Sequence, residues 1–219
     1  MIRMLQIAAA SMLGMSLIAA NSARAADDKK DDAKPAVIVA VIKGTEAHKD
    51  IKGRLTFKDV DGGGVHVVGE ISGLTPGKHG FHIHQKGDLS DPKLVSAGGH
   101  FNPGGTKHGG PGSDEKHAGD WGNIEANDKG VAKIEGTFKG VSLHGEKNGI
   151  MGRSVIVHAG ADDLKTDPSG NSGDRIAGGV IEAKKPMTKD DAKKSVSDEA
   201  KKTVDDVKKG IDDLKKEIK

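Results

Sequence analysis

The histidines of this chain are concentrated in one stretch. Ten occur among 219 residues, and six of those lie between residues 79 and 117. His82 and His84 are two residues apart, so an extended strand would place both imidazoles on one face, where they can share a metal ion. The other candidate ligands are His100, His108 and His117, at intervals of eight and nine residues, then Asp120, and finally His158 at the end of a later apolar run.

This set of side chains has the chemistry of a metal centre. Imidazole nitrogens suit copper and zinc, and a carboxylate is a common additional ligand for zinc. The chain contains no cysteine, which excludes an iron–sulfur cluster and an all-cysteine zinc site. A lone histidine in a loop is usually a surface residue, but five clustered histidines with an aspartate favour a copper or zinc site.

The elements that must position these side chains are predicted to be β-strands. From residue 36 to about residue 183, short runs of β-branched residues are separated by Gly, Asp and Asn, without a helical period. This pattern predicts one all-β domain, a sandwich or barrel, over residues 36–185. Two long glycine-rich stretches, 85–120 and 159–175, interrupt it, and loops of this length usually carry function. The eight predicted strands are 36–42, 51–57, 65–71, 79–84, 121–126, 131–138, 153–158 and 176–181.

The N-terminus has the pattern of a secretory signal. Arg3 precedes a mostly apolar segment over residues 5–20, and residues 23–25 offer a small-x-small cleavage site. We predict a signal peptide over residues 1–25 and a secreted or periplasmic protein. The alternative, a membrane anchor, is disfavoured because the apolar segment is short and interrupted, so no membrane span is predicted. Residues 26–35 are charged and poor in apolar side chains, which predicts a solvated linker.

The charge balance gives no indication of a nucleic-acid partner. Removal of residues 1–25 takes away two arginines and no acid, which leaves equal numbers of basic and acidic residues. Aromatic residues make up only 2% of the chain, so part of it is expected to lie outside any core.

The C-terminal residues 186–219 have a different period. Near-repeats of seven residues place apolar side chains at their third and seventh positions, which lie on one face of a helix. We predict an amphipathic helical tail. Its apolar stripe can mediate self-association into a homo-oligomer or docking to an envelope partner; the alternative is a solvated, partly helical tail.

Five stretches of the chain closely resemble the copper/zinc superoxide dismutases. They are GFHIH (80–84), SAGGHFNPGGTKHGGP (96–111), HAGDWGN (117–123), VIVHAGADDL (155–164) and GNSGDRIAGGVI (170–181). The resemblance covers about residues 36–183 and implies an eight-stranded Greek-key β-barrel. It implies copper on His82, His84, His100 and His158, and zinc on His100, His108, His117 and Asp120.

The same resemblance implies roles for three further features. His100 would be a deprotonated bridge between the metals, and Arg175 matches the arginine that guides the anion to copper. Asp162 matches a carboxylate that joins a copper histidine, His82, to a zinc histidine, His108. The implied reaction is disproportionation of superoxide anion to oxygen and hydrogen peroxide by copper redox cycling, with His100 taking up and returning a proton.

The chain departs from the family pattern at its disulfide. The matching positions are Leu94 and Gly178, so the long loop over residues 85–120 must be held in another way. Burial of Leu94 is one candidate. Two other functions remain as alternatives: a copper buffer or carrier, which would need no anion-guiding arginine, and an envelope-interaction module in which the tail has the main role.

Overall fold

The structure, a computed structural model, describes residues 36–185 and Lys208. The predictions of a signal peptide over 1–25, a linker over 26–35 and a helical tail over 186–219 therefore fall outside the described residues, apart from Lys208, which is helical and exposed. In the described part of the chain, no helix is long and apolar enough to cross a membrane.

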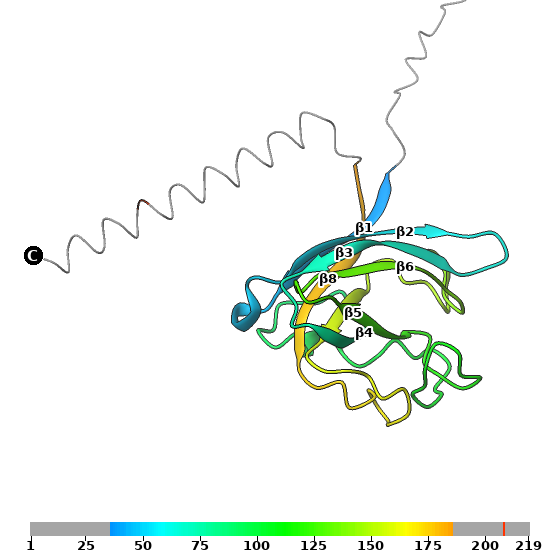
Figure 1. Cartoon of the computed structure of the whole chain (residues 1–219). Coiled ribbons are helices and arrows are strands. Elements are labelled where there is room, and N and C mark those ends of the chain that lie inside the picture. Colours follow the sequence, from blue (N-terminus) through cyan, green and yellow to red (C-terminus); the bar gives the residue numbers. More distant parts are fainter. Residues whose placement is uncertain (1–35, 186–207, 209–219) are drawn as a thin grey trace, which may run out of the picture. The chain divides into compact units, whose positions relative to one another are not determined.

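Eight antiparallel strands form a closed barrel in the order β1-β2-β3-β6-β5-β4-β7-β8 (Figure 1). The connections from β3 to β4 and from β6 to β7 each pass over two strands, as in a Greek key. The predicted all-β fold and all eight predicted strands are confirmed, with ends that differ by at most three residues. The strands are β1 (Val37–Gly44), β2 (Lys52–Asp59), β3 (Val65–Ser72), β4 (Gly77–His84), β5 (Asp120–Ala126), β6 (Ala132–Phe138), β7 (Ser154–His158) and β8 (Arg175–Lys184).

The barrel interior is filled by aliphatic side chains and a small aromatic group. Trp121 is 3% exposed and stacks on Phe138, with ring centroids 4.0 Å apart, while Phe57 and Phe81 pack against it at an angle. In the middle of strand β2, Leu55 and Phe57 are buried whereas Arg54 and Lys58 are exposed, as expected when one face of a sheet meets the core and the other meets water.

Strands β4 and β7 depart from that alternation. From His79 to His84 in β4, and throughout β7, both faces are buried. The inward face of β4 carries Phe81 and Ile83 of the core, so its outward face, with His82 and His84, must be covered by other parts of the chain.

Two long connections lie over the outer side of these strands. They are residues 85–119 between β4 and β5, and residues 159–174 between β7 and β8, and Figure 1 shows both on the side of the barrel where β4 and β5 lie. The pairing of β4 with β5 shifts register between Gly80 and His82, and that of β7 with β8 shifts between Val157 and His158. Such irregularities redirect side chains near functional sites, and here they flank two of the predicted ligands.

Candidate metal centre

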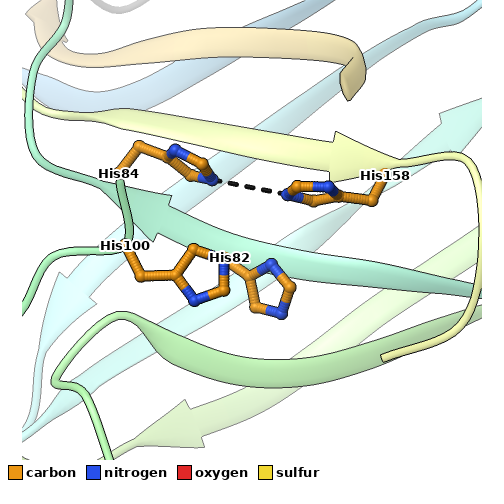
Figure 2. Close-up of side chains that lie close together, drawn as sticks. All are labelled: His82, His84, His100 and His158. Atoms are coloured by element: carbon orange, nitrogen blue, oxygen red, sulfur yellow. Dashed lines mark hydrogen bonds between the residues drawn. The ribbon is translucent and has the colours of Figure 1, made fainter. Parts of the chain in front are cut away.

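The first cluster, called here the four-histidine group, consists of His82, His84, His100 and His158. One nitrogen of each ring lies within 4.8 Å of the others, and all four residues are buried. His82 and His84 come from the end of β4, His158 from the end of β7 and His100 from the 85–119 loop, which is attached to β4 by a bridge between His84 and His100. Figure 2 shows the four rings facing one another.

The far nitrogen of three of these rings is held by a hydrogen-bond acceptor. His84 Nδ1 donates to the carbonyl oxygen of Gly98 at 2.9 Å, and His158 Nδ1 donates to that of Gly173 at 3.1 Å. His82 Nε2 donates to Asp162 Oδ2 at 2.8 Å. Because these oxygens only accept, each ring carries its proton on the far side and turns a lone pair inward.

The second cluster, called here the Asp120 group, consists of His100, His108, His117 and Asp120, all buried and with ligand atoms within 4.8 Å of one another. Asp120 Oδ1 lies 2.7 Å from His100 Nδ1 and 3.1 Å from both His108 Nδ1 and His117 Nδ1. The His108 contact lacks the geometry of a hydrogen bond. Asp120 Oδ2 instead accepts hydrogen bonds from the backbone N–H groups of Gly109 and His117. One carboxylate oxygen therefore faces three imidazoles while the other fixes its orientation.

Asp162 connects the two clusters through rings at their outer edges. Besides His82, its carboxylate accepts a hydrogen bond from His108 Nε2 at 2.9 Å. Its backbone is held by the amide of Asn123, which donates to the Asp162 carbonyl and accepts from the Asp162 N–H. Gly170 lies so close that a Cβ there would overlap Asp162 Oδ1 and approach His108 Nε2. The absence of a side chain at residue 170 is thus required for this bridge.

Burial keeps three imidazoles of the four-histidine group neutral, those of His84, His100 and His158. It lowers the pKa of His100 to about 4, although the hydrogen bond to Asp120 works in the opposite direction. Burial, reinforced by the neighbouring His82, lowers the pKa of His158 to about 3. It also lowers the pKa of His84 well below its ordinary value. A neutral imidazole has a free lone pair, which is the form that binds metal ions.

The two aspartates stay ionised for a different reason. Burial by itself would raise the pKa of Asp120, but hydrogen bonds from His100 and from the backbone of Gly109 and His117 outweigh it and hold the pKa well below its usual range. The pKa of Asp162 is also lowered, because hydrogen bonds from His82 and His108 outweigh the effect of burial.

The donor set fits copper and zinc ions. Three buried imidazole nitrogens, His82 Nδ1, His100 Nε2 and His108 Nδ1, find no hydrogen-bond partner among the residues that the structure describes. The Nε2 atoms of His84 and His158 lie 3.4 Å apart, within hydrogen-bond distance (dashed line in Figure 2). Because Nδ1 of each ring donates to a carbonyl oxygen, neither Nε2 of the neutral rings carries a proton that it could donate to the other. Lone pairs that face one another at this distance repel, and unpaired buried polar atoms are costly. A cation among these atoms would remove both penalties.

A cavity of about 350 Å³ gives access to the four-histidine group. Its lining includes His84, His100 and His158 together with Arg175, the first residue of β8. Arg175 is partly buried, and its Nη1 donates to the carbonyl oxygen of Leu94 at 2.6 Å. Burial lowers the pKa of Arg175, with Asp91 acting in the opposite direction, and the guanidinium remains charged. The predicted anion-guiding arginine therefore lies in the wall of the same cavity.

The structure also identifies supporting residues that sequence analysis did not single out. His79 contacts the carbonyl oxygen of His158 through Nδ1 at 2.8 Å and that of Thr75 through Nε2 at 2.9 Å. Asp167 accepts a hydrogen bond from the backbone N–H of His108 at 2.6 Å. Neither belongs to a recurring spacing, so only the folded loops reveal these contacts.

Comparison with known proteins identifies the protein family. The sequence model of a family described as copper/zinc superoxide dismutase (SODC) matches residues 51–181, which include every predicted ligand and Arg175. The chain belongs to this family. Its reaction is the conversion of superoxide to oxygen and hydrogen peroxide, and its cofactors are copper and zinc. The chain is thus an oxidoreductase rather than only a copper buffer or carrier.

Individual relatives agree with this assignment. The chain is 48% identical to the extracellular superoxide dismutase [Cu-Zn] of Drosophila melanogaster over 138 residues, 60% of this chain and 75% of the relative. It is 44% identical to superoxide dismutase [Cu-Zn] 3 of Arabidopsis thaliana over 149 residues, 65% of this chain and 88% of the relative. Among solved structures, the clock protein EA4 is similar, with a TM-score of 0.61, 43% identity and coverage of 67% of this chain and 94% of that one.

Replacement of Asp162 by asparagine is expected to weaken metal binding by both groups of side chains. The amide group of the variant would offer one acceptor where the carboxylate now accepts from both His82 and His108, so one ring loses its orientation. We expect the affinity for copper and zinc to fall about 10- to 100-fold in competition with a chelator. The matched control is Asp128→Asn in the exposed turn between β5 and β6. Unchanged affinities in Asp162→Asn would contradict the orienting role.

Proposed function

We propose that the four-histidine group holds copper, that the Asp120 group holds zinc, and that His100 is shared between them. Three imidazoles with one carboxylate suit zinc, and an all-imidazole set suits copper. The support for the sharing is geometric, because His100 belongs to both clusters: Nδ1 is directed to Asp120, while Nε2 is an unpartnered atom of the four-histidine group. One copper and one zinc ion would occupy both clusters.

The metals and the protein residues would divide the chemistry between them. Bound copper would supply one-electron redox chemistry and bound zinc a fixed positive charge beside the shared ring. Two superoxide anions and two protons yield one oxygen and one hydrogen peroxide, so the site has to admit anions and deliver protons. His100 Nε2 is the atom at which a proton would be held between the two half-reactions and then transferred to the reduced product, while solvent in the cavity supplies the second proton.

Arg175 would attract and orient the anion. Its guanidinium lines the cavity beside His84 and His158, and the hydrogen bond to Leu94 fixes it there. A fixed positive charge in a narrow cavity raises the encounter rate of a small anion, and superoxide dismutase is itself a well-known example of such electrostatic steering. The proposed role is therefore guidance of superoxide, without a bond to either metal.

Arg175→Ala is expected to leave both metals in place and to lower kcat/KM for superoxide by about tenfold or more at low ionic strength, because one guiding charge is lost. The salt dependence of the rate should weaken as well, since less attraction remains to be screened. The measurements are copper and zinc content and superoxide decay across a series of salt concentrations. Arg54→Ala, on the exposed face of β2, removes an equal charge away from the cavity and serves as the control. A salt dependence identical to that of the unmodified protein would rule out guidance by Arg175.

Export of the chain is a further part of this proposal. The apolar segment and the small-x-small site at residues 23–25 support removal of residues 1–25 and a secreted or periplasmic location. The relative in Drosophila melanogaster is named as an extracellular enzyme, which supports the same compartment.

N-terminal sequencing of exported protein is expected to begin at Ala26. Ala25→Arg should block cleavage, because the position before the cut requires a small side chain, whereas Ala33→Arg in the linker should have no effect. Protein that retains Met1, or that stays in the cytoplasm, would contradict the prediction.

The tail over residues 186–219 is proposed to join copies of this chain through its apolar stripe. The stripe is narrow and Gly210 lowers the helix propensity of the segment, so an isolated helix would be only partly formed and would gain stability by pairing. Docking to an envelope component is the alternative use of the same stripe.

A version of the chain ending at Lys185 tests the tail. We expect the mass and helix content of the full-length mature protein to rise with concentration, in sedimentation and circular dichroism, and those of the shortened protein to stay constant. Activity per copper should be equal in the two, because every proposed ligand precedes the tail. Concentration-independent mass in the full-length protein would reject self-pairing.

A further inference from the structure

A small apolar cluster lies apart from the barrel core and joins the 85–119 loop to the barrel. It consists of buried Leu94, Ala97 and Ile156, with Leu89 partly buried against them; we call it the Leu94 cluster. Ile156 comes from β7 and the other three come from the loop. Leu94 is 7% exposed, so its side chain is held almost entirely within this contact.

Gly178 provides the space that this cluster occupies. It lies on β8 directly opposite Ile156 in the strand pairing. A Cβ at residue 178 would be 2.8 Å from Ile156 Cδ1 and 3.4 Å from Leu89 Cδ2. The distance to Ile156 Cδ1 is shorter than contacts between real Cβ atoms and their neighbours. The side chains of Ile156 and Leu89 therefore occupy the space that a side chain at residue 178 would need.

The backbone of Leu94 is fixed in an unusual conformation. Its φ is +58°, in the left-handed region that non-glycine residues seldom adopt, so the surroundings must hold it there. Its N–H donates to the carbonyl oxygen of Asp91, whose side chain accepts from the N–H groups of Lys93 and Val95. Its own carbonyl oxygen accepts the hydrogen bond from Arg175. The buried side chain and the Arg175 contact thus belong to the same residue.

We propose that Leu94 is a positioning residue for Arg175. Its side chain, anchored among Leu89 and Ile156, fixes the carbonyl oxygen that holds the guanidinium in the cavity wall. This inference rests on the proposed guiding role of Arg175. In this chain, which has no cysteine, an apolar contact attaches the loop to the barrel. Such an attachment does not depend on thiol redox conditions.

The experiment compares metal-loaded Leu94→Ala with Leu94→Met, which conserves volume, and with Leu74→Ala. Leu74 is 5% exposed, belongs to the barrel core and lies in the turn between β3 and β4, so it controls for lost stability. We expect Leu94→Ala to lose about three- to tenfold in kcat/KM per bound copper at low ionic strength, with a weaker salt dependence. Amide hydrogen exchange over residues 85–98 should become faster. Leu94→Met should restore both properties, and Leu74→Ala should lower the melting temperature but keep the salt dependence of the unmodified protein.

The outcomes separate this inference from the role on which it rests. If Arg175→Ala weakens the salt dependence and Leu94→Ala does not, the inference is wrong and the role of Arg175 stands. If Arg175→Ala has no effect, both are overturned. Should Leu94→Ala fail to load copper, Leu89→Ala, which trims a partly buried member of the cluster, provides the same comparison.

Discussion

The arrangement of this site depends on the pair of hydrogen bonds that the Asp162 carboxylate accepts from two imidazoles. This carboxylate lies in the 159–174 loop and accepts hydrogen bonds from His82 on β4 and His108 on the 85–119 loop. A buried carboxylate is tolerated only when its oxygens are satisfied, and here the two imidazoles and the backbone N–H of Leu164 do so. The same contacts decide which nitrogen of each ring carries the proton. One side chain therefore fixes two loops, two tautomers and the orientation of both clusters.

The requirement to bury this polar network explains the shape of the protein around it. The barrel interior is apolar and cannot hold charged groups, so the histidines lie on the outer face of β4 and β7. That face would be exposed in a simple barrel, and the two long loops exclude water from it. The loops need many turns without regular pairing, which glycine permits at positions of positive φ such as Gly98 and Gly170. A residual opening on one side leaves Arg175 at the boundary between the site and solvent.

The sequence pattern within short segments predicted the strands and turns, because these depend mainly on neighbouring residues. Strands follow from β-branched runs and turn residues, and the pairing of His82 with His84 follows from the period of a strand. The partition of ligands between two metals came from resemblance to a family, because His100, His108 and His117 lie in a loop without periodicity. Contacts between distant segments, such as His79 with His158 or Leu94 with Arg175, could not be predicted, since nothing in either segment alone encodes its partner.

The lack of cysteine raises the question of how a loop of this length is held without a covalent link. A disulfide typically contributes about 2–4 kcal/mol. Burial of one leucine side chain contributes about 1.5–3 kcal/mol, which the Leu94 cluster supplies near one end of the loop.

Arg153 provides a second attachment of the loop. Its guanidinium lies 3.6 Å from the centroid of the Phe101 ring and donates to the carbonyl oxygen of Gln85, while its Nε donates to the carbonyl oxygen of Gly149. A cation–π contact contributes about 0.5–2 kcal/mol. The two attachments together are of the same order as a disulfide in magnitude, and they hold the loop on both sides of His100.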